Sequence, residues 1–326
     1  RLSTDMFCCG QRRFATANQK VDDQESCFYG RPEDVPGEVH MLIVGLDYSC
    51  DRVSWAGKNV LDTKYAVDMM EDLARCSEVA SLEKLWNQQC TKENVIAKIQ
   101  EVAGRCGEDD YFIFYYTGHG DQLISQDDDE EETHDQCFCL VDANGSTDDA
   151  TMTYRHQVWL RDDDFVDAVL EAIDETANVL VLVDACHSGT ICDFNSGLWA
   201  ERGQKAISIS GCADAQTSAG TGKGGHFTRA LTRSVQELQA QLGLDANYSV
   251  GQLYNKTLEN YEESKNQGHR QDIEIHGCAV YPAEMVWPLA PRQPYISRAN
   301  MQGMTSQNHF QHQGMQPAPA NWSLAG

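Results

Sequence analysis

The chain has 326 residues, 41% hydrophobic and 23% charged, which is enough for one large globular domain or two smaller ones with a sizeable core. Its formal net charge of −25 argues against nucleic acid and anionic membranes as partners, and favours cationic partners or bound metal ions. No run of eighteen apolar residues occurs, so we expect no membrane-spanning helix.

The thirteen cysteines follow no framework spacing, and no Cys-x-x-Cys pair or Cys/His quartet points to a zinc site. This usage is typical of reduced thiols in a cytosol-like compartment. No charged segment followed by an apolar one opens the sequence, so we expect no signal peptide and a cytoplasmic location.

Apolar runs and helical periodicity divide the chain into alternating strands and helices. Residues 1–38 are polar and irregular, and we interpret them as an arm that is ordered only where it docks. The predicted strands cover residues 40–46, 82–86, 111–116, 137–141, 179–183, 205–210 and 272–279. The predicted helices cover residues 60–73, 91–105, 160–175, 227–242 and 250–261, and residues 194–204 read as a linker. From about residue 292 the chain is a polar tail without apolar period, either mobile or peripherally docked.

This order predicts an α/β fold with a mostly parallel sheet covered by helices on both faces. The last predicted strand is the candidate for an antiparallel edge.

Two of the predicted strands end in residues that can act together as a nucleophile and a base. The strand at 179–183 runs into Asp184 and Cys186, and the strand at 111–116 leads to His119 between two glycines. Carboxyl ends of parallel strands face the crevice where α/β proteins bind ligands. A single buried Cys is more often a small core residue, and a single strand-end His a satisfied polar group. The two together favour a Cys–His catalytic pair.

The residues around this pair resemble a known family. Residues 116–120 read Tyr-Thr-Gly-His-Gly, and residues 184–189 read Asp-Ala-Cys-His-Ser-Gly. They are similar, nearly letter for letter, to the Y-S-G-H-G and D-S-C-H-S-G boxes of the metacaspases, caspase-like cysteine peptidases of the C14 kind. Residues 210–219 and 225–231 resemble the family's S-G-C-x-D-x-Q-T-S-A and G-x-F-T-x-A-L segments. The resemblance runs from about residue 40 to residue 279 and follows the order of type I members.

The resemblance implies a caspase-like three-layer sandwich with a sheet of six to eight strands. The catalytic domain would span 39–290, with a large-subunit-like part at 39–200 and a small-subunit-like part at 205–290. It would lie between an N-terminal arm at 1–38, which could cover the active site, and a tail at 291–326. Members of this order are often monomers.

The activity that the resemblance implies is endopeptidase cleavage after Arg or Lys. Cys186 would attack the scissile carbonyl as a thiolate, and His119 would protonate the leaving amine. The backbone N–H groups of Gly120 and Cys186 are the candidate oxyanion donors. Asp62, Thr117 and Asp184 match the S1 pocket positions, where carboxylates suit a guanidinium. For Asp62, a carboxylate in the first turn of a helix is the competing interpretation.

The resemblance also implies calcium activation. The family's ligating aspartates fall on Asp135, Asp162, Asp163 and Asp193, and hard cations favour such oxygen ligands. The remaining acidic residues of the 127–132 run read as a solvated loop. Asp162, Asp163 and Asp164 also suit the first turn of a helix.

Two further features concern regulation. Tyr29, in the arm, is a candidate plug of the active site, a role that an arm residue has in some type I members. Candidate autocleavage sites are Lys223 in a Gly-rich loop, Arg202 and Lys205 in the linker, and Arg31 in the arm.

Two alternatives to a calcium-activated Arg/Lys-specific endopeptidase stay open. One is a non-catalytic caspase-like scaffold or calcium-binding regulator, which the acidic charge would also serve; the presence of both His119 and Cys186 argues against it. The other is a related cysteine hydrolase that cleaves after Asn or acidic residues. Asp62 and Asp184 argue against an acidic P1 residue by charge repulsion.

Overall fold

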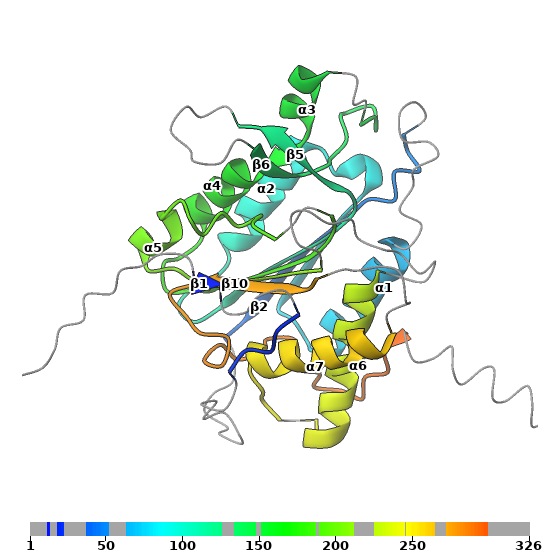
Figure 1. Cartoon of the computed structure of the whole chain (residues 1–326), viewed down its shortest axis with the longest axis vertical. Helices are drawn as coiled ribbons and strands as arrows, with labels where there is room; N and C mark the ends of the chain where they lie inside the picture. The colour runs from blue at the N-terminus through cyan, green and yellow to red at the C-terminus, as the bar shows by residue number, and fades with distance from the viewer. Residues whose placement is uncertain are drawn as a thin grey trace, which may run out of the picture.

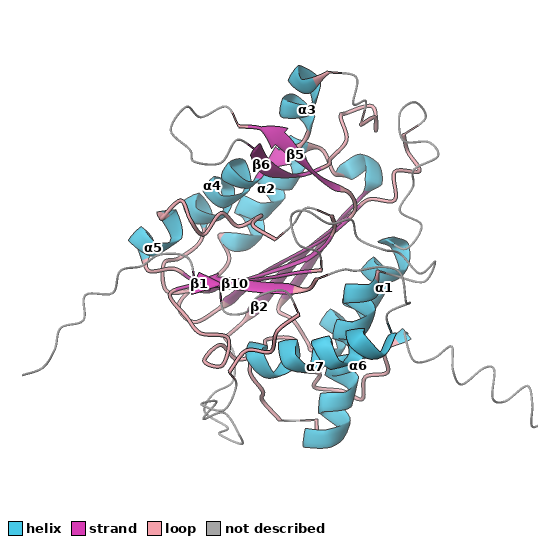
Figure 2. Ribbon diagram, in the orientation of Figure 1, coloured by secondary structure: helices cyan, strands magenta, loops and turns pink. Residues whose placement is uncertain are grey.

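The computed structural model describes residues 12–13, 18–22, 37–51, 63–125, 134–147, 151–186, 189–211, 225–244, 246–264 and 272–298. In this part of the chain, a twisted central sheet lies between two layers of helices (Figures 1 and 2). The predicted α/β sandwich is therefore confirmed. None of the helices described is both long and apolar enough to cross a membrane.

The central sheet has seven strands in the order β1-β10-β9-β8-β4-β2-β3. Strands β2, β3, β4, β8 and β9 run parallel, and β10 pairs antiparallel with β9, as expected for the last predicted strand. Every residue of β2, β4 and β8 is buried, because helices cover both faces of these strands. The bounds are β1 (Arg12–Arg13), β2 (Val39–Gly45), β3 (Ser81–Trp86), β4 (Tyr111–Thr117), β8 (Asn178–Asp184), β9 (Lys205–Ser210) and β10 (Glu274–Cys278).

Each face of the sheet has its own apolar core. One core packs β4 and β8 against α2 (Lys92–Ala103) and α4 (Asp162–Ala172). The other packs the opposite face against α1 (Thr63–Cys76), α6 (His226–Leu242) and α7 (Val250–Ser264). The predicted cap of α2 is present: the Thr91 side chain accepts a hydrogen bond from the Asn94 N–H at 3.2 Å.

A second, three-stranded antiparallel sheet starts immediately after His119. It contains β5 (Gly120–Ile124), β6 (His134–Phe138) and β7 (Leu160–Arg161) in that order. The sequence did not predict β5, because Leu123 is its only buried residue and no apolar alternation marks it. The strand predicted at 137–141 begins earlier, at His134, and β7 occupies the start of the helix predicted from residue 160. A short helix, α3 (Met152–Val158), precedes β7.

The described parts of the N-terminal arm dock on the sheet edge. Strand β1 pairs antiparallel with β10, with Arg13 opposite His276. Farther along, the Val21 N–H donates to Asn255 Oδ1 at 2.9 Å, and Asn255 Nδ2 donates to the Val21 carbonyl at 3.0 Å. The arm thereby extends the sheet and holds α7.

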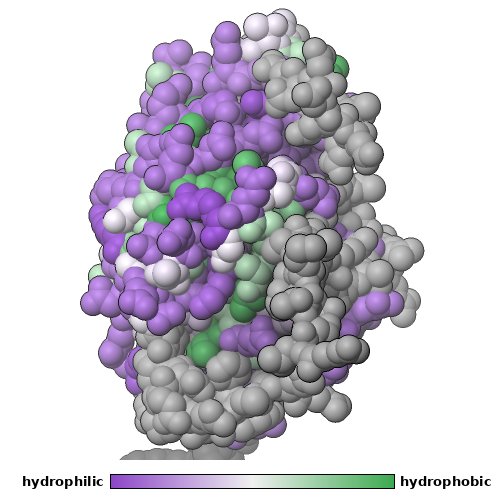
Figure 3. All heavy atoms as spheres, turned by 90° about the vertical axis from the view of Figure 1, so that its left-hand side faces the viewer, coloured by the Kyte–Doolittle hydropathy of each residue, from purple (hydrophilic) through white to green (hydrophobic). Residues whose placement is uncertain are grey.

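The first part of the C-terminal tail also docks. Arg298 forms ion pairs with Asp72 and Asp68 of α1, and the ring of Tyr295 is buried. The tail is therefore packed on the helical layer through residue 298. The coloured part of the face in Figure 3 is mostly hydrophilic, with apolar side chains in small patches.

Candidate active site and cation site

The register of β4 and β8 brings the Cys and the His to the same edge of the sheet. Thr117 and Asp184 are direct partners in the parallel pairing of the two strands. His119 lies two residues beyond Thr117, and Cys186 lies two residues beyond Asp184. Because parallel strands end at one edge, both side chains emerge from neighbouring strands at equivalent positions.

Gly120 lies against the chain that follows β8. A Cβ atom at this position would overlap the backbone carbonyl oxygen of Cys186. Only glycine fits such a close backbone approach. The chain after His119 is thereby held directly against the residue proposed as nucleophile.

The backbone of His119 is held by hydrogen bonds on both sides. Its N–H donates to the Tyr48 hydroxyl at 2.8 Å. Its carbonyl accepts from the Tyr116 hydroxyl at 2.7 Å and from the Cys139 N–H at 3.1 Å. The Tyr48 ring lies 5.0 Å from the imidazole ring, tilted by 35°. Sequence analysis did not predict these contacts.

Cys186 differs from most other described cysteines in its exposure. Its side chain is only partly buried. Burial raises the pKa of Cys106 and of Cys192 to about 12, and raises the pKa of Cys90 and Cys139 further. Those four thiols are therefore protonated and inert near neutral pH.

Asp184, a predicted S1 residue, is buried against the start of α6. Its Oδ2 accepts hydrogen bonds from the Thr228 hydroxyl at 2.6 Å and the Thr228 N–H at 3.2 Å. A Cβ at Gly225 would overlap its carboxylate. A carboxylate at a helix N-terminus is stabilised by the helix dipole and the unpaired N–H groups. The carboxylate is thus held in a fixed place, and Thr228 is a contact that the sequence did not suggest.

The other predicted S1 residues are placed differently. Thr117 is buried at the end of β4, next to Asp184 in the register. Asp62 lies outside the described residues, immediately before α1.

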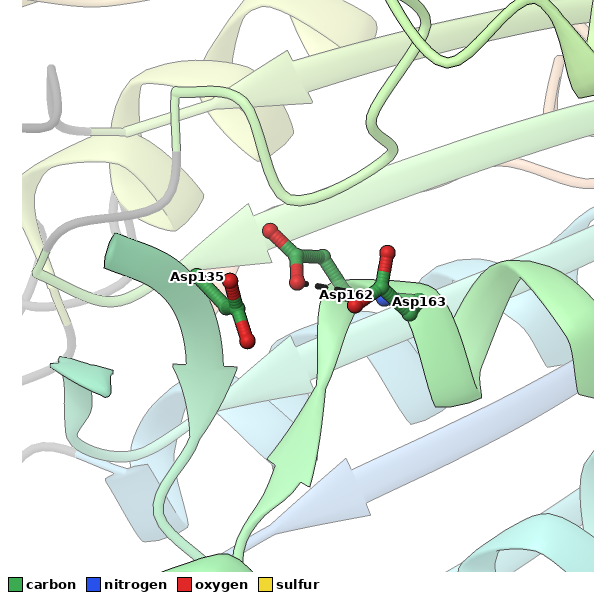
Figure 4. A group of neighbouring side chains, drawn as sticks. All are labelled: Asp135, Asp162 and Asp163. Atoms are coloured by element: carbon green, nitrogen blue, oxygen red, sulfur yellow. Dashed lines mark hydrogen bonds between the residues drawn. The ribbon is translucent and has the colours of Figure 1, made fainter. Parts of the chain in front are cut away.

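Three of the four predicted calcium ligands lie together. Asp135 of β6 and Asp162 and Asp163 at the start of α4 have carboxylate oxygens within 4.8 Å of one another (Figure 4). Burial raises the pKa of Asp162 to about 8, helped by the charges of Asp163 and Asp135 and opposed by a hydrogen bond from the Gln136 N–H. Asp193, on the loop after Cys186, also has a raised pKa, mainly from burial and partly from the Asp135 charge.

The chemistry of this cluster fits a hard cation. Asp135 is 3% exposed, and among the described residues its buried Oδ1 has no hydrogen-bond partner. A buried carboxylate oxygen without a partner is costly, and a cation would remove that cost. Oxygen ligands from several carboxylates are the set that calcium prefers.

Two of the predicted autocleavage sites lie in ordered elements. Arg202 belongs to a short helix, α5 (Leu198–Arg202), within the stretch predicted as a linker. Its guanidinium donates to the carbonyls of Leu170 and Ile173, so it caps the end of α4. Lys205 is the first residue of β9 and its side chain is 46% exposed. Lys223, Arg31 and the candidate plug Tyr29 lie outside the described residues.

Comparison with known proteins agrees with the fold and with the family that the sequence resembles. The family model described as metacaspase, peptidase C14 domain, matches residues 42–195. Metacaspase-1 of Arabidopsis thaliana is 26% identical over 198 residues, which cover 55% of this chain and 51% of that protein. Metacaspase-2 of Trypanosoma brucei brucei is 26% identical over 231 residues, covering 62% of this chain and 60% of that protein. The chain thus spans between half and two thirds of the length of these relatives.

Solved structures show the same fold at low identity. Caspase-1 of Spodoptera frugiperda has a TM-score of 0.51 at 12% identity, with 86% of this chain and all of that chain covered. A protein of Geobacter sulfurreducens has a TM-score of 0.52 at 20% identity, with 80% of this chain and 99% of that chain covered.

These likenesses show a caspase-like fold. The matching family model and the relatives support a metacaspase, a caspase-like protein of the C14 kind.

Proposed function

We propose that this chain is a calcium-activated cysteine endopeptidase that cleaves after Arg or Lys. The observation that carries the proposal is the pairing of Thr117 with Asp184, which puts His119 and Cys186 at equivalent places on one sheet edge. The contact of Gly120 with the Cys186 carbonyl supports it, since it fixes the two strand ends against each other.

The proposed reaction is acyl transfer to the thiol. The Cys186 thiolate attacks the scissile carbonyl, and the oxyanion is met by the N–H groups of Gly120 and Cys186. Collapse of the tetrahedral intermediate breaks the peptide bond, and protonated His119 gives its proton to the leaving amine. His119 then takes a proton from water as the water attacks the thioester, and collapse of this intermediate releases the acid product and restores the Cys186 thiolate beside protonated His119.

The proposed preference for Arg or Lys rests on buried negative charge beside the nucleophile. The Asp184 carboxylate lies two residues before Cys186 and is fixed by Thr228. Burial of a carboxylate in that place favours a cationic P1 side chain, and Arg can bind it in a bidentate manner. Thr117 and Asp62 complete the proposed pocket. An acidic P1 residue would be repelled.

The proposed calcium site is formed by Asp135, Asp162, Asp163 and Asp193. When bound there, calcium would neutralise the clustered carboxylates and fix the segments that carry them. Asp135 pairs with Leu123 of β5, the strand that begins at Gly120, and Asp193 lies seven residues after Cys186. The cluster therefore joins the chain that follows His119 to the chain that follows Cys186.

The oligomeric state and the cellular location of the protein are two further proposals. We propose a monomer, which the pairing of β1 along β10 supports, because an exposed edge strand is a surface for self-association. We propose a cytoplasmic location, which the thirteen cysteines without framework spacing support.

Paired fluorogenic peptides test the proposal, one with Arg and one with Asp at P1. Each is incubated with calcium, with chelator, and with the Cys186→Ala variant. Calcium-dependent cleavage of the Arg peptide alone, absent in Cys186→Ala, is the expected result. Lack of cleavage in folded protein under every condition would instead indicate a non-catalytic calcium-binding scaffold.

A further inference from the structure

Arg161 places a positive charge inside the acidic cluster. Its Nη1 lies 3.1 Å from Asp135 Oδ2 and 3.4 Å from Asp163 Oδ2. Its Nε lies 3.5 Å from Asp164 Oδ2. The Arg161 side chain is only 16% exposed, so its guanidinium is mostly enclosed by the cluster. The residue is the second one of β7 and directly precedes Asp162.

The guanidinium contacts two of the residues that a divalent cation would use. Asp135 and Asp163 both belong to the group whose oxygens lie within 4.8 Å of one another. A guanidinium and a metal ion bound to the same carboxylates repel each other, so each lowers the affinity of the cluster for the other.

Arg161 neutralises only part of the negative charge of the cluster. Asp135 uses Oδ2 for Arg161, whereas its buried Oδ1 has no hydrogen-bond partner among the described residues. Asp162 directs Oδ2 to the Gln136 N–H and not to Arg161. The carboxylates of the cluster also outnumber the single guanidinium. An added cation is still favoured, but it must displace part of the existing ion pairing.

Asp164 forms an ion pair with Arg161 that does not involve the proposed calcium ligands. It contacts Nε, whereas Asp135 contacts Nη1, and it is itself bound by Lys92 at 2.6 Å. Asp164 is absent from the group of three that could hold a metal. Arg161 can therefore leave Asp135 and Asp163 while it keeps one ion pair on α4.

We propose that Arg161 is the resident counter-cation of this site, that it competes with calcium for Asp135 and Asp163, and that it thereby sets the calcium affinity. The proposal rests on the proposed function insofar as the cluster binds calcium. The exchange takes place at Asp135 of β6, whose partner strand β5 begins at Gly120. Calcium affinity and order in the chain after His119 are therefore coupled through one arginine.

The test compares calcium binding by the full-length wild type, Arg161→Gln and Arg161→Lys. All carry Cys186→Ala, so that self-cleavage cannot alter the protein. Arg105→Gln is the matched control, because Arg105 follows α2 and forms ion pairs with Glu83 of β3 and Glu101 of α2, none of which is a residue of the cluster. Isothermal titration with calcium gives the affinity, and melting in chelator and in calcium gives the stability.

Arg161→Gln is expected to bind calcium about tenfold more tightly than wild type. In chelator it should melt at a lower temperature than wild type, and calcium should reduce this difference in melting temperature. Arg161→Lys should bind with an affinity near that of wild type, since a charge remains. If Arg161→Gln folds and binds calcium no more tightly than wild type, while wild type does bind calcium, the proposed role of Arg161 is overturned. The proposed calcium site is not affected by that result. If Arg161→Gln does not fold, Arg161→Lys decides: a tenfold tighter calcium affinity in this variant, with the Arg105→Gln control near wild type, would overturn the role of the charge at this position. Absence of calcium binding in wild type overturns the calcium part of the proposed function and this proposal together, while peptide cleavage independently tests the dyad.

Discussion

The Tyr48 hydroxyl accepts a hydrogen bond from the backbone N–H of His119 at 2.8 Å and donates one to the Cys139 carbonyl at 2.8 Å. Tyr48 has a φ of 57°, in the left-handed region that is unfavourable for a bulky residue. The chain thus keeps an unusual backbone conformation at the residue that holds the proposed catalytic histidine. Tyr48 acts as a positioning residue for His119.

We expect Tyr48→Phe to lower kcat for the Arg peptide by about tenfold and to change KM much less. The variant keeps the ring but leaves two buried backbone groups without their partner, which costs about 1–3 kcal/mol where the histidine is held. Steady-state kinetics at saturating calcium measure the effect. Tyr254→Phe is the control, because it removes a buried hydroxyl that donates to the Ile273 carbonyl on the other face of the sheet. An equal fall of kcat in both variants would show a general loss of stability and not a positioning role.

Gly120→Ala should lower kcat/KM by about a hundredfold, since small misplacement of reacting groups has effects of that size. The added methyl group would overlap the Cys186 carbonyl oxygen, so one of the two strand ends must shift. Gly107→Ala is the matched control: there the nearest atom to an added Cβ is Asp110 Oδ2 at 3.5 Å, an ordinary contact. Circular dichroism establishes that both variants fold. Activity of Gly120→Ala within twofold of wild type would contradict the close approach.

The raised thiol pKa values predict an order of alkylation in the native protein. Cys106 and Cys192, with a pKa of about 12, carry almost no thiolate between pH 7 and pH 9, so iodoacetamide should leave them unmodified over that whole range. Cys50 is partly exposed, and burial raises its pKa, so its labelling should be slow at pH 7 and increase as the pH rises. Cys186 should react first at pH 7 if His119 stabilises its thiolate. Peptide mass spectrometry of briefly labelled protein measures the order, and Cys50 reacting as fast as Cys186 at pH 7 would exclude such a pair.

The sequence predicted those parts of the fold that carry a local pattern. The apolar runs of β4 and β8 predicted two buried strands with His119 and Cys186 at their ends, and every residue of both strands is buried. Strand β5 was missed because only Leu123 of its five residues is buried. Helix α5 was missed because its five residues are too few to show a helical apolar period, although Leu198, Ala200 and Glu201 favour helix.

The contacts that complete the candidate site are non-local and have no sequence signal of their own. Tyr48 and His119 are 71 residues apart, and Asp184 and Thr228 are 44 apart. The pairing of Arg161 with Asp135 joins residues 26 apart on neighbouring strands. The family resemblance supplied the carboxylates, but only the three-dimensional arrangement shows a guanidinium among them.

The last prediction concerns the arm. Val21 is 6% exposed and exchanges two hydrogen bonds with Asn255 of α7, whereas the neighbouring Lys20 is exposed and forms an ion pair with Glu259. Asn255→Ala removes both bonds to the Val21 backbone, so residues 18–22 should open more often and trypsin should cleave after Lys20 several-fold faster.

The experiment uses the Cys186→Ala background, so that no cleavage comes from the protein itself. Mass spectrometry follows the fragment that begins at Val21. Glu259→Gln is the matched control, because an exposed ion pair contributes at most about 1 kcal/mol and its loss should leave the cleavage rate nearly unchanged. If trypsin cleaves after Lys20 at the same rate in wild type and Asn255→Ala, the arm opens without breaking these hydrogen bonds. The contact with Asn255 would then not hold the arm on the domain.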